Sequence, residues 1–261
     1  MAALRVEKIE DGAVARRRDV EVARVTGRLG EGVFGHHAWI DWTLADGEDA
    51  AVLAELYAIA ADPWVSDGRM PHYVDVPADR DDVIEAWFGL CFGRQQVYAA
   101  RRTAGAEPYE GPVHVRIGGP DDVDVAVTHG DLIFRRHGDA PVWASGIYDT
   151  TRDEWVEFLG EEQSTYFVAE IEGRAVAHLL LYDKDETPRD ETYLAIAATL
   201  PEARGVGAMR ALTAMALAWA ERNGYTTCAT DWRSTNIESS RFGTNRGVTP
   251  TSYRLHRLVG H

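Results

Sequence analysis

A turn with two glycines, lying between a strand-like run and a long helix pattern, constrains the fold more than any other stretch of the chain. The strand-like run covers 193–199, and the turn carries Gly205 and Gly207. The helix pattern that follows has apolar residues at spacings of three and four: Met209, Leu212, Ala216 and Trp219. A glycine turn at a helix N-terminus presents backbone N–H groups at the positive end of the helix dipole. The sequence therefore predicts a phosphate-binding turn.

Strands and helices alternate around this turn. Strands are predicted at 113–117, 166–171, 175–181, 193–199, 226–232 and 252–259. Helices are predicted from Pro120, over 151–159 behind a threonine cap, from the glycine turn to Asn223-Gly224, and from a capping box formed by Thr235 and Glu238. This alternation indicates an α/β domain.

The N-terminal part is predicted to form a smaller unit. Its strands are expected at 38–42, 72–76 and 95–101, and its helices at 48–60 and 79–90. The segment 103–112 is rich in Gly, Pro and Ala, as linkers are, so we place the boundary there and predict domains 1–107 and 108–261. The stretches 80–101 and 236–257 have the same order of features: a helix start, an aromatic residue, a short apolar segment and a strand. Either an ancient duplication or chance explains this internal similarity.

Composition and charge narrow the function. The chain has 261 residues and 45% hydrophobic residues, enough for a globular protein with an ample core. Its 42 acidic against 27 basic residues give a net charge of −15, which argues against nucleic-acid binding. The run 211–220 is shorter than the roughly 20 apolar residues of a membrane span, and the N-terminus has charges where a signal peptide is apolar. We expect a cytoplasmic protein, no membrane contact, and two reduced, buried thiols, Cys91 and Cys228.

Two motifs in the C-terminal part resemble those of the GNAT superfamily of acyl-CoA-dependent N-acetyltransferases. The first resembles Arg/Gln-x-x-Gly-x-Gly/Ala and is read from Arg204, with Met209 at the last small position. A reading two residues earlier matches both glycines but places Glu202 at the Arg/Gln position. We prefer the register that starts at Arg204, because it keeps the usual distance from Pro201 and places Arg-Ala-Leu where the family's helix often has them.

The second motif resembles the family's Asn-x-x-Ala-x-x-Phe-Tyr-x-x-x-Gly-Phe helix. It reads Asn236-x-x-Ser239-x-x-Phe242-Gly243-x-x-x-Gly247-Val248. The resemblance covers about 113–259 and implies an α/β (α+β) fold, with a mixed, mostly antiparallel sheet flanked by helices. The smaller N-terminal unit would be a degenerate copy, since it has no Arg-x-x-Gly-x-Gly loop.

The resemblance also implies acetyl-CoA, or another acyl-CoA, as the donor. Backbone groups at the edge of the strand would hold the pantetheine arm: Ala197, Ala198 and Thr199. The turn and the start of the helix would hold the pyrophosphate: Arg204, Gly205, Val206, Gly207, Ala208, Met209 and Arg210. Asn236 of the second motif would reach the cofactor.

Transfer to an amine needs a base, because a free alkylamine is protonated up to a pKa of about 10. Asp231 is our first candidate; Asp190, Glu191 and Glu238 remain alternatives. In many family members a tyrosine near the leaving sulfur acts as general acid, but that position is Gly243 here. Water or Ser240 would have to serve instead. His178, inside an apolar strand, is predicted to be a packed histidine.

The sequence therefore leads to two main hypotheses. The first is an N-acetyltransferase that acts on the amine of a small molecule by direct attack in a ternary complex. The second is a non-catalytic acyl-CoA-binding or regulatory module, which Gly243 and Met209 favour; a peptide N-terminal acetylating enzyme is a weaker third reading. No metal is expected, since His36 and His37 have no third ligand at suitable spacing. The N-terminal unit would support the fold, cover the acceptor cleft or mediate a homodimer.

Overall fold

The computed structural model describes residues 3–144, 150–183 and 188–260. Two compact units make up the chain: unit 1 comprises 1–98 and 250–261, and unit 2 comprises 99–249. These limits differ from the predicted domains 1–107 and 108–261. The reason is the last strand, β12 (Thr249–Leu258), which pairs antiparallel with β5 (Pro71–Pro77) of unit 1. Leu255 of β12 is fully buried in the core of that unit.

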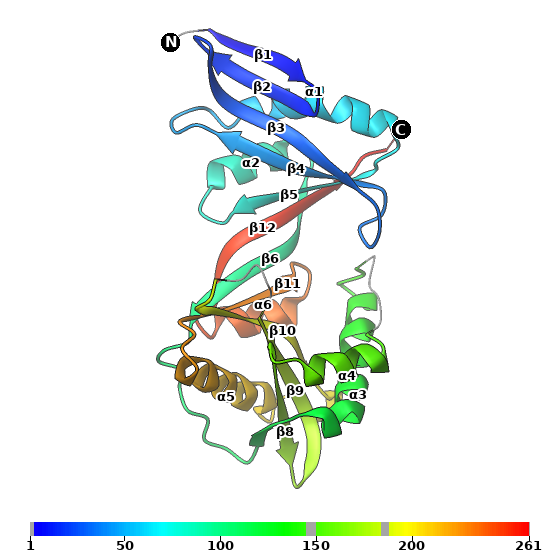
Figure 1. Ribbon diagram of the computed structural model, residues 1–261, viewed down its shortest axis with the longest axis vertical. Coiled ribbons are helices and arrows are strands. Elements are labelled where there is room, and N and C mark those ends of the chain that lie inside the picture. Colours follow the sequence, from blue (N-terminus) through cyan, green and yellow to red (C-terminus); the bar gives the residue numbers. More distant parts are fainter. Residues whose placement is uncertain (1–2, 145–149, 184–187, 261) are drawn as a thin grey trace. The chain divides into compact units, whose positions relative to one another are not determined.

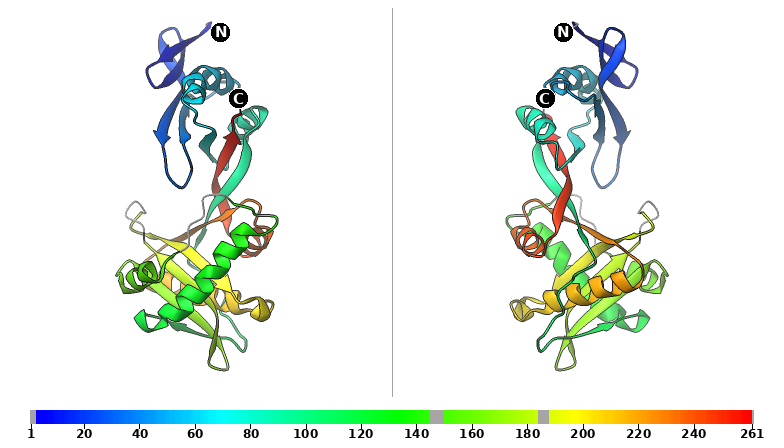
Figure 2. Two further views of the ribbon diagram at one scale, coloured as in Figure 1. Left: turned by 90° about the vertical axis from the view of Figure 1, so that its right-hand side faces the viewer. Right: turned by 90° about the vertical axis from the view of Figure 1, so that its left-hand side faces the viewer.

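Unit 1 is a twisted sheet with helices on one face (Figures 1 and 2). Its strand order is β1 (Leu4–Ile9), β2 (Gly12–Arg17), β3 (Val20–Gly30), β4 (His37–Leu44), β5, β12 and the first part of β6 (Gly93–Arg102). The contact between β4 and β5 is parallel, and the strands β1 to β4 pair antiparallel. The helices are α1 (Val52–Ser66) and α2 (Asp81–Gly89).

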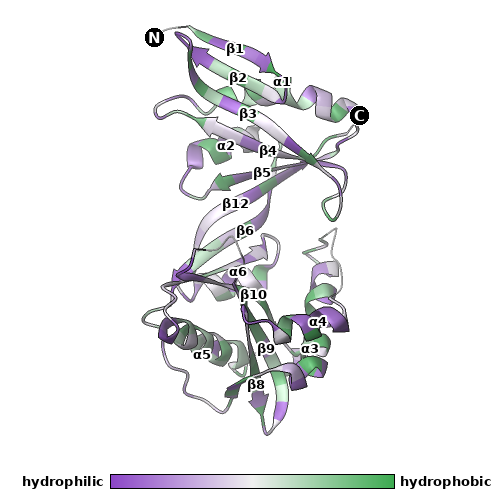
Figure 3. Ribbon diagram, in the orientation of Figure 1, coloured by the Kyte–Doolittle hydropathy of each residue, from purple (hydrophilic) through white to green (hydrophobic). Residues whose placement is uncertain are grey.

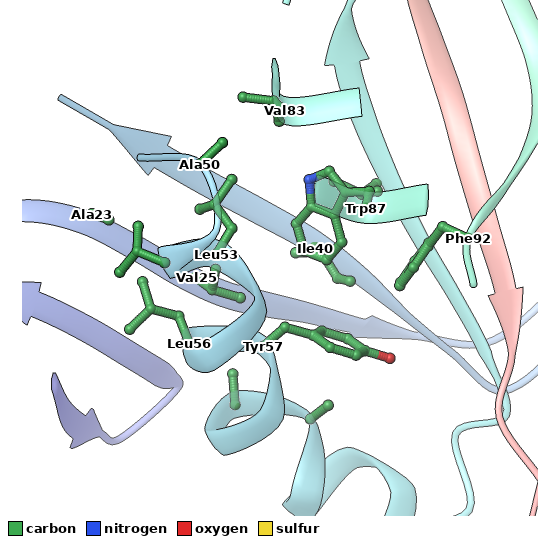
Figure 4. Packing of buried hydrophobic residues seen from close by; sticks show 14 of the residues in the cluster. Ala23, Val25, Ile40, Ala50, Leu53, Leu56, Tyr57, Val83, Trp87 and Phe92 are labelled. Carbon is green, nitrogen blue, oxygen red and sulfur yellow. The ribbon is translucent and has the colours of Figure 1, made fainter. Parts of the chain in front are cut away.

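The core of unit 1 forms between α1, α2 and the sheet. Leu53 and Leu56 of α1 are fully buried, and Ile40 of β4 and Trp87 of α2 are also buried in the same cluster. Figure 4 shows these side chains around Tyr57 and Phe92. Burial of each such side chain stabilises the fold by about 1.5–3 kcal/mol, so α1 is held mainly by its apolar face.

Unit 2 is a sheet with helices on both faces. After β7 (His114–Ile117) come a 3₁₀ turn (Pro120–Asp122), α3 (Val123–Gly138), α4 (Arg152–Gly160), β8 (Ser164–Ile171), β9 (Arg174–Tyr182) and β10 (Glu191–Thr199). A second 3₁₀ turn (Pro201–Ala203), α5 (Ala208–Arg222), β11 (Thr227–Arg233) and α6 (Ile237–Thr244) follow. The strand order is the last part of β6, then β11, β10, β9, β8 and β7.

Alternate residues of the central hairpin of unit 2 face different helices. Phe167 and Leu179 pack with α5, whereas Val168 and Leu180 pack with Trp155 of α4 and with α3. Figure 3 shows β9 as strongly hydrophobic, as expected for a strand covered on both sides. The predicted mixed, mostly antiparallel sheet flanked by helices is confirmed.

Three sequence expectations need correction. The N-cap of α6 is Asn236, whose side chain accepts a hydrogen bond from the Ser239 N–H, and not Thr235, whose hydroxyl donates to the Val142 carbonyl. Cys91 is exposed in the turn after α2, whereas Cys228 is buried as expected. The strands β1 to β3 were not predicted at all. The sequence allows Thr150 or Thr151 as the cap of α4, and the structure has Thr151, with Glu154 completing its capping box. No helix in the described ranges is long and apolar enough to cross a membrane.

Candidate functional site

An opening begins where the two parallel strands of unit 2 stop pairing. The register between β10 and β11 runs from Glu191↔Thr227 to Leu194↔Thr230 and goes no further. A β-bulge follows immediately, between Leu194 and Ile196, and Ala195 is exposed although it lies in the middle of the sheet. Beyond Leu194, β10 therefore has a free edge toward β11.

The predicted pantetheine residues lie on this free edge. Ala197, Ala198 and Thr199 pair with β9 on one side, in register with 177–179. Their other edge faces the opening, where N–H and C=O groups are available for a ligand. An extended ligand with amide groups would bind there by extending the sheet. The structure thus brings these three residues to one edge, and their role in binding pantetheine stays a prediction.

The glycine turn lies between the end of β10 and the start of α5. Gly205 and Gly207 have φ of 81° and 91°, a region that side chains other than glycine rarely occupy. Gly207 is the N-cap of α5 and offers no side-chain cap, and the first turn carries no acidic residue. A helical hydrogen bond from the Ala211 N–H to the Gly207 carbonyl (2.9 Å) leaves the preceding N–H groups outside the helix. The turn therefore has the geometry of an anion site.

The other residues of the first motif occupy distinct positions around this turn. Arg204 is 53% exposed and lies 3.7 Å from Glu238, a contact that solvent screens strongly. Met209 packs partly against the α5 side of the core. The side chain that replaces the family's last small residue thus points into the core cluster, which leaves the backbone of the turn accessible. Val206 and Arg210 are exposed.

A cluster of arginines near the turn was not predicted. Burial first, and then the charges of Arg210 and Arg101, lower the pKa of Arg246. The charge of Glu107 acts in the opposite direction and offsets part of this effect. Its guanidinium lies 4.4 Å from the Phe242 ring, and its Nε is buried without an acceptor in the described chain. Arg101 donates to the Arg246 carbonyl (2.6 Å). Three cations gathered in this way favour a bound anion, but their separation in the sequence hides the cluster from any local motif.

The predicted linker contributes to the site as well. Tyr109, in the middle of 103–112, packs partly against the α5 side of the core, and its hydroxyl lies 3.4 Å from the Val206 carbonyl. A Cβ placed on Gly207 would lie 3.1 Å from the Tyr109 hydroxyl. The glycine is therefore needed both for its backbone angle and for the close approach of this ring.

Asp231 lies at the start of the opening. It is half-buried and directly follows Thr230, the last residue of β11 paired with β10. Its neighbour Trp232 contacts Gly243 of α6, so by strand alternation Asp231 points to the opposite face. Arg233 shares that face, and its charge adds to burial in lowering the pKa of His137 on α3. Asp231 therefore lies on the α3 side of the opening.

The alternative bases lie elsewhere. Asp190 and Glu191 are at the opposite end of β10, where the Asp190 carboxylate accepts a hydrogen bond from the Thr226 hydroxyl (2.7 Å). Glu238 contacts two arginines, Arg204 and Arg136. Of the four carboxylates, only Asp231 is adjacent to the point where the strands separate.

The remaining predicted residues belong to α6 and β9. The Asn236 side-chain oxygen accepts from the Ser239 N–H (3.2 Å), so its amide NH₂ is the group left for a ligand. Ser240 is half-buried on the same helix. His178 is fully buried and hydrogen-bonded to the Tyr166 hydroxyl (2.9 Å), and burial lowers its pKa to about 3. Its prediction as a packed histidine is confirmed. Across the ranges with described coordinates, no group of three or more His, Cys, Asp or Glu residues is placed to hold a metal ion.

Comparisons with known proteins concern the family of part of the chain and the fold of the whole chain. Residues 133–244 match the model of the acetyltransferase (GNAT) family. A GCN5-related N-acetyltransferase from Sphaerobacter thermophilus has 14% identity and a TM-score of 0.64, over 97% of this chain and 82% of that one. One from Kribbella flavida has 13% identity and a TM-score of 0.57, over 98% and 90%.

A tandem GNAT protein from the clavulanic acid biosynthesis pathway is similar over both units. It has 13% identity and a TM-score of 0.54, over 99% of this chain and 84% of that one. At such identities the likeness concerns the fold alone, and it extends through the N-terminal unit. No curated protein matches the chain in sequence.

Proposed function

We propose that this chain, whose residues 133–244 match the acetyltransferase (GNAT) family model, moves an acetyl group from acetyl-CoA to the amine of a small molecule. One observation carries this proposal. The free edge of β10 leads directly into the uncapped, glycine-bearing N-terminus of α5. An edge for amides followed by a site for an anion is complementary to pantetheine followed by pyrophosphate.

The donor set supports acetyl-CoA as the bound donor. The backbone of 205–210 would hold the pyrophosphate, and the edge of 197–199 would hold the amides of the pantetheine arm. The three arginines Arg101, Arg210 and Arg246 would hold the remaining phosphate, since among the described residues the carboxylate of Glu107 is the one acidic charge that acts on Arg246 beside these cations. When bound, acetyl-CoA supplies a thioester whose acetyl carbon bonds to the amine nitrogen while the sulfur retains the electron pair of the broken bond.

The protein's own part in the reaction is to accept a proton. The amine must be neutral when it attacks, although its pKa in water is about 10. Asp231, on the α3 side of the opening, takes the proton that the nitrogen loses, directly or through one water. That proton then passes to solvent, and a solvent proton reaches the sulfur, so the overall charge balances. Ser240 on α6 is the second polar group for this exchange.

A non-catalytic acyl-CoA-binding module is the alternative. Gly243 favours it, because the second motif then lacks the hydroxyl that a tyrosine would supply. The position of Asp231 at the opening favours the enzyme, since a module that only binds acyl-CoA has no need of a carboxylate there.

Calorimetry with CoA and acetyl-CoA, combined with thiol release in the presence of small amines, tests the proposal. We expect heat from both ligands and thiol release with at least one amine. Arg246→Gln should weaken CoA binding about tenfold and reduce its salt dependence, with a smaller effect on dephospho-CoA. Arg222→Gln, at the other end of α5, is the matched control and should leave binding unchanged. Heat without thiol release for any amine would establish the binding module, and absence of heat would overturn both readings.

A further inference from the structure

Two buried hydrogen-bond donors lie at the end of β11 without an acceptor. Trp232 is 9% exposed and its indole Nε1 is buried, and the Ser234 hydroxyl two residues later is buried as well. Neither atom has a partner within the described residues. A buried donor that makes no hydrogen bond destabilises a fold. Such donors occur elsewhere in the chain, as at Trp87, so what distinguishes this pair is its position at the end of the strand pairing.

The position of Trp232 places this donor beside the opening. Trp232 is the second residue after Thr230, where the pairing between β10 and β11 ends. A Cβ placed on Gly243 would lie 3.5 Å from Cη2 and 3.6 Å from Cζ3 of its indole ring. The ring therefore packs against α6 at the position where the second motif has no side chain. Asp231 and Trp232 are consecutive, so they face opposite sides of the strand.

Unit 1 has an indole at the end of its own parallel pair that is hydrogen-bonded within the chain, whereas the indole N–H of Trp87 in its core has no partner among the described residues. There the parallel pairing of β4 and β5 ends at Ile40↔Val74. The indole Nε1 of Trp42, two residues later on β4, donates to the Asp75 carbonyl of β5 (2.9 Å) and so connects the two strands. In unit 2 the indole lies on β11, the second strand of the pair and not the first, and its N–H has no acceptor among the described residues.

We propose that the indole N–H of Trp232 donates a hydrogen bond to the sulfur of bound CoA and stabilises it as the departing thiolate. This inference rests on the proposed function. The amine and its base occupy the Asp231 side of the strand, so the sulfur departs on the Trp232 side. Indole is a donor only and keeps its proton throughout, and a hydrogen bond to a charged acceptor is about twice as strong as a neutral one. The hydroxyl of Ser234, two residues later in the chain, is a second donor near Trp232.

A spectroscopic experiment tests the contact without relying on turnover. In protein labelled with ¹⁵N-tryptophan, the indole peak that Trp232→Phe removes should move downfield when CoA is added above the thiol pKa of about 8.5. Desulfo-CoA, which lacks the sulfur, should not produce this shift. Trp232→Phe should also raise the pKa of the bound CoA thiol by about one unit, the size expected when one charge-assisted hydrogen bond is lost.

Kinetics provide a second readout. Because phenylalanine keeps an aromatic ring in place, Trp232→Phe should lower kcat about 10- to 100-fold and change the KM for acetyl-CoA less than threefold. Trp219→Phe is the matched control: Trp219 lies on α5, where it stacks on Tyr225, and the substitution should change neither kcat nor the thiol pKa.

The outcomes separate this inference from the proposed function. If the wild type binds CoA and releases thiol, but the Trp232→Phe variant keeps the wild-type thiol pKa and kcat, the inference is overturned and the function stands. A variant with a lower melting temperature, an unchanged thiol pKa and parallel losses in kcat and affinity would show a purely structural tryptophan, which also overturns the inference. If the wild type does not bind CoA, both proposals are overturned.

Discussion

Each unit contains a parallel pair of strands joined by a helix, and in each pair the register covers only part of the strands. In unit 1 the pair is β4 and β5, joined through α1, and it ends at Ile40↔Val74. In unit 2 the pair is β10 and β11, joined through α5, and it ends at Leu194↔Thr230. The backbone arrangement is therefore the same, and the differences lie in what surrounds the opening.

The first difference between the units concerns the segment that precedes the connecting helix. In unit 1 it carries Asp46, Glu48 and Asp49, and the Asp49 carboxylate accepts a hydrogen bond from the Ala51 N–H (2.9 Å). Glu48 pairs with Arg17 of β2 (2.9 Å). The chain's own carboxylates thus occupy the region that in unit 2 is left to bare N–H groups. A helix N-terminus attracts an anion in both units. In unit 1 the chain's own carboxylates lie in that segment, and in unit 2 an anion from solution is the proposed occupant.

The second difference concerns the carboxylate that follows the last residue pair of the two parallel strands. Asp75 and Asp231 hold the same register position, one residue past Val74 and Thr230. Burial raises the pKa of Asp75, and its Oδ2 accepts from the Trp39 indole (3.1 Å). Asp231 lies instead beside the point where β10 and β11 stop pairing. The same residue type at the same position is hydrogen-bonded to an indole in one unit and is the proposed base of the reaction in the other.

Loss of the glycine turn should produce the largest difference between the units. Gly207→Asp adds a negative charge at φ 91° and a Cβ 3.1 Å from the Tyr109 hydroxyl, so CoA binding should weaken about 100-fold or more in calorimetry. Gly47→Asp makes the same change in the unit 1 segment, where φ is 79° and nothing lies within 4 Å, and should leave binding unchanged. If both variants bind CoA equally well, the glycine turn is not the pyrophosphate site.

Replacement of one of the two equivalent carboxylates, Asp231, should have the next largest effect. Asp231→Asn should lower kcat about 100-fold and remove the ascending limb of the pH–rate profile, because a general base contributes about 10²–10⁴. Asp75→Asn is the matched control and should keep kcat within threefold. Thiol release between pH 6 and 9 measures both rates. Equal rates for the two variants would contradict the assignment of Asp231 as the base.

Acid should destabilise both units through a buried histidine in each. Burial lowers the pKa of His72 to about 4 and that of His178 to about 3. The unfolded chain binds a proton below about pH 6.5, whereas the folded one does not, so stability falls as the pH drops from 6.5 toward 4. Each histidine should account for about 2 kcal/mol of the loss by pH 4.5.

Urea unfolding at pH 7 and pH 4.5 measures this loss. His72→Gln and His178→Gln should each be less stable at pH 7, since the hydroxyls of Tyr57 and Tyr166 lose their partners. Each should also lose less stability on acidification than the wild type does. Unchanged pH dependence in both variants would mean that other groups are responsible.

Removal of the carboxylate cap in unit 1 should have the smallest effect. Asp49→Ala frees the Ala51 N–H and should lower the free energy of unfolding by about 0.5–1 kcal/mol, with no change in CoA affinity. A gain of CoA binding at unit 1 would sharpen the comparison further, because it would show that the carboxylates alone exclude the ligand there.

Local signals were read correctly from the sequence where a few adjacent residues suffice. The Thr151 cap with Glu154 and the strands around the turn are examples. The capping of α6 was misread because Thr235 and Asn236 are both good cap residues, and only the path of the chain after β11 selects the second. The strands β1 to β3 were missed because their pairing partners, and not a strong periodicity, define them.

The sequence by itself determined the glycine turn, the order of strands and helices around it, and the second motif with its missing tyrosine, because backbone angles and helix periodicity depend on neighbours in the chain. The tertiary structure alone decided that β12 completes the sheet of unit 1, that three distant arginines gather near the turn, and that Tyr109 packs on Gly207. These features are contacts between residues far apart in the chain. Hydrophobic burial and strand pairing select such contacts, and neither leaves a mark in any short stretch of sequence.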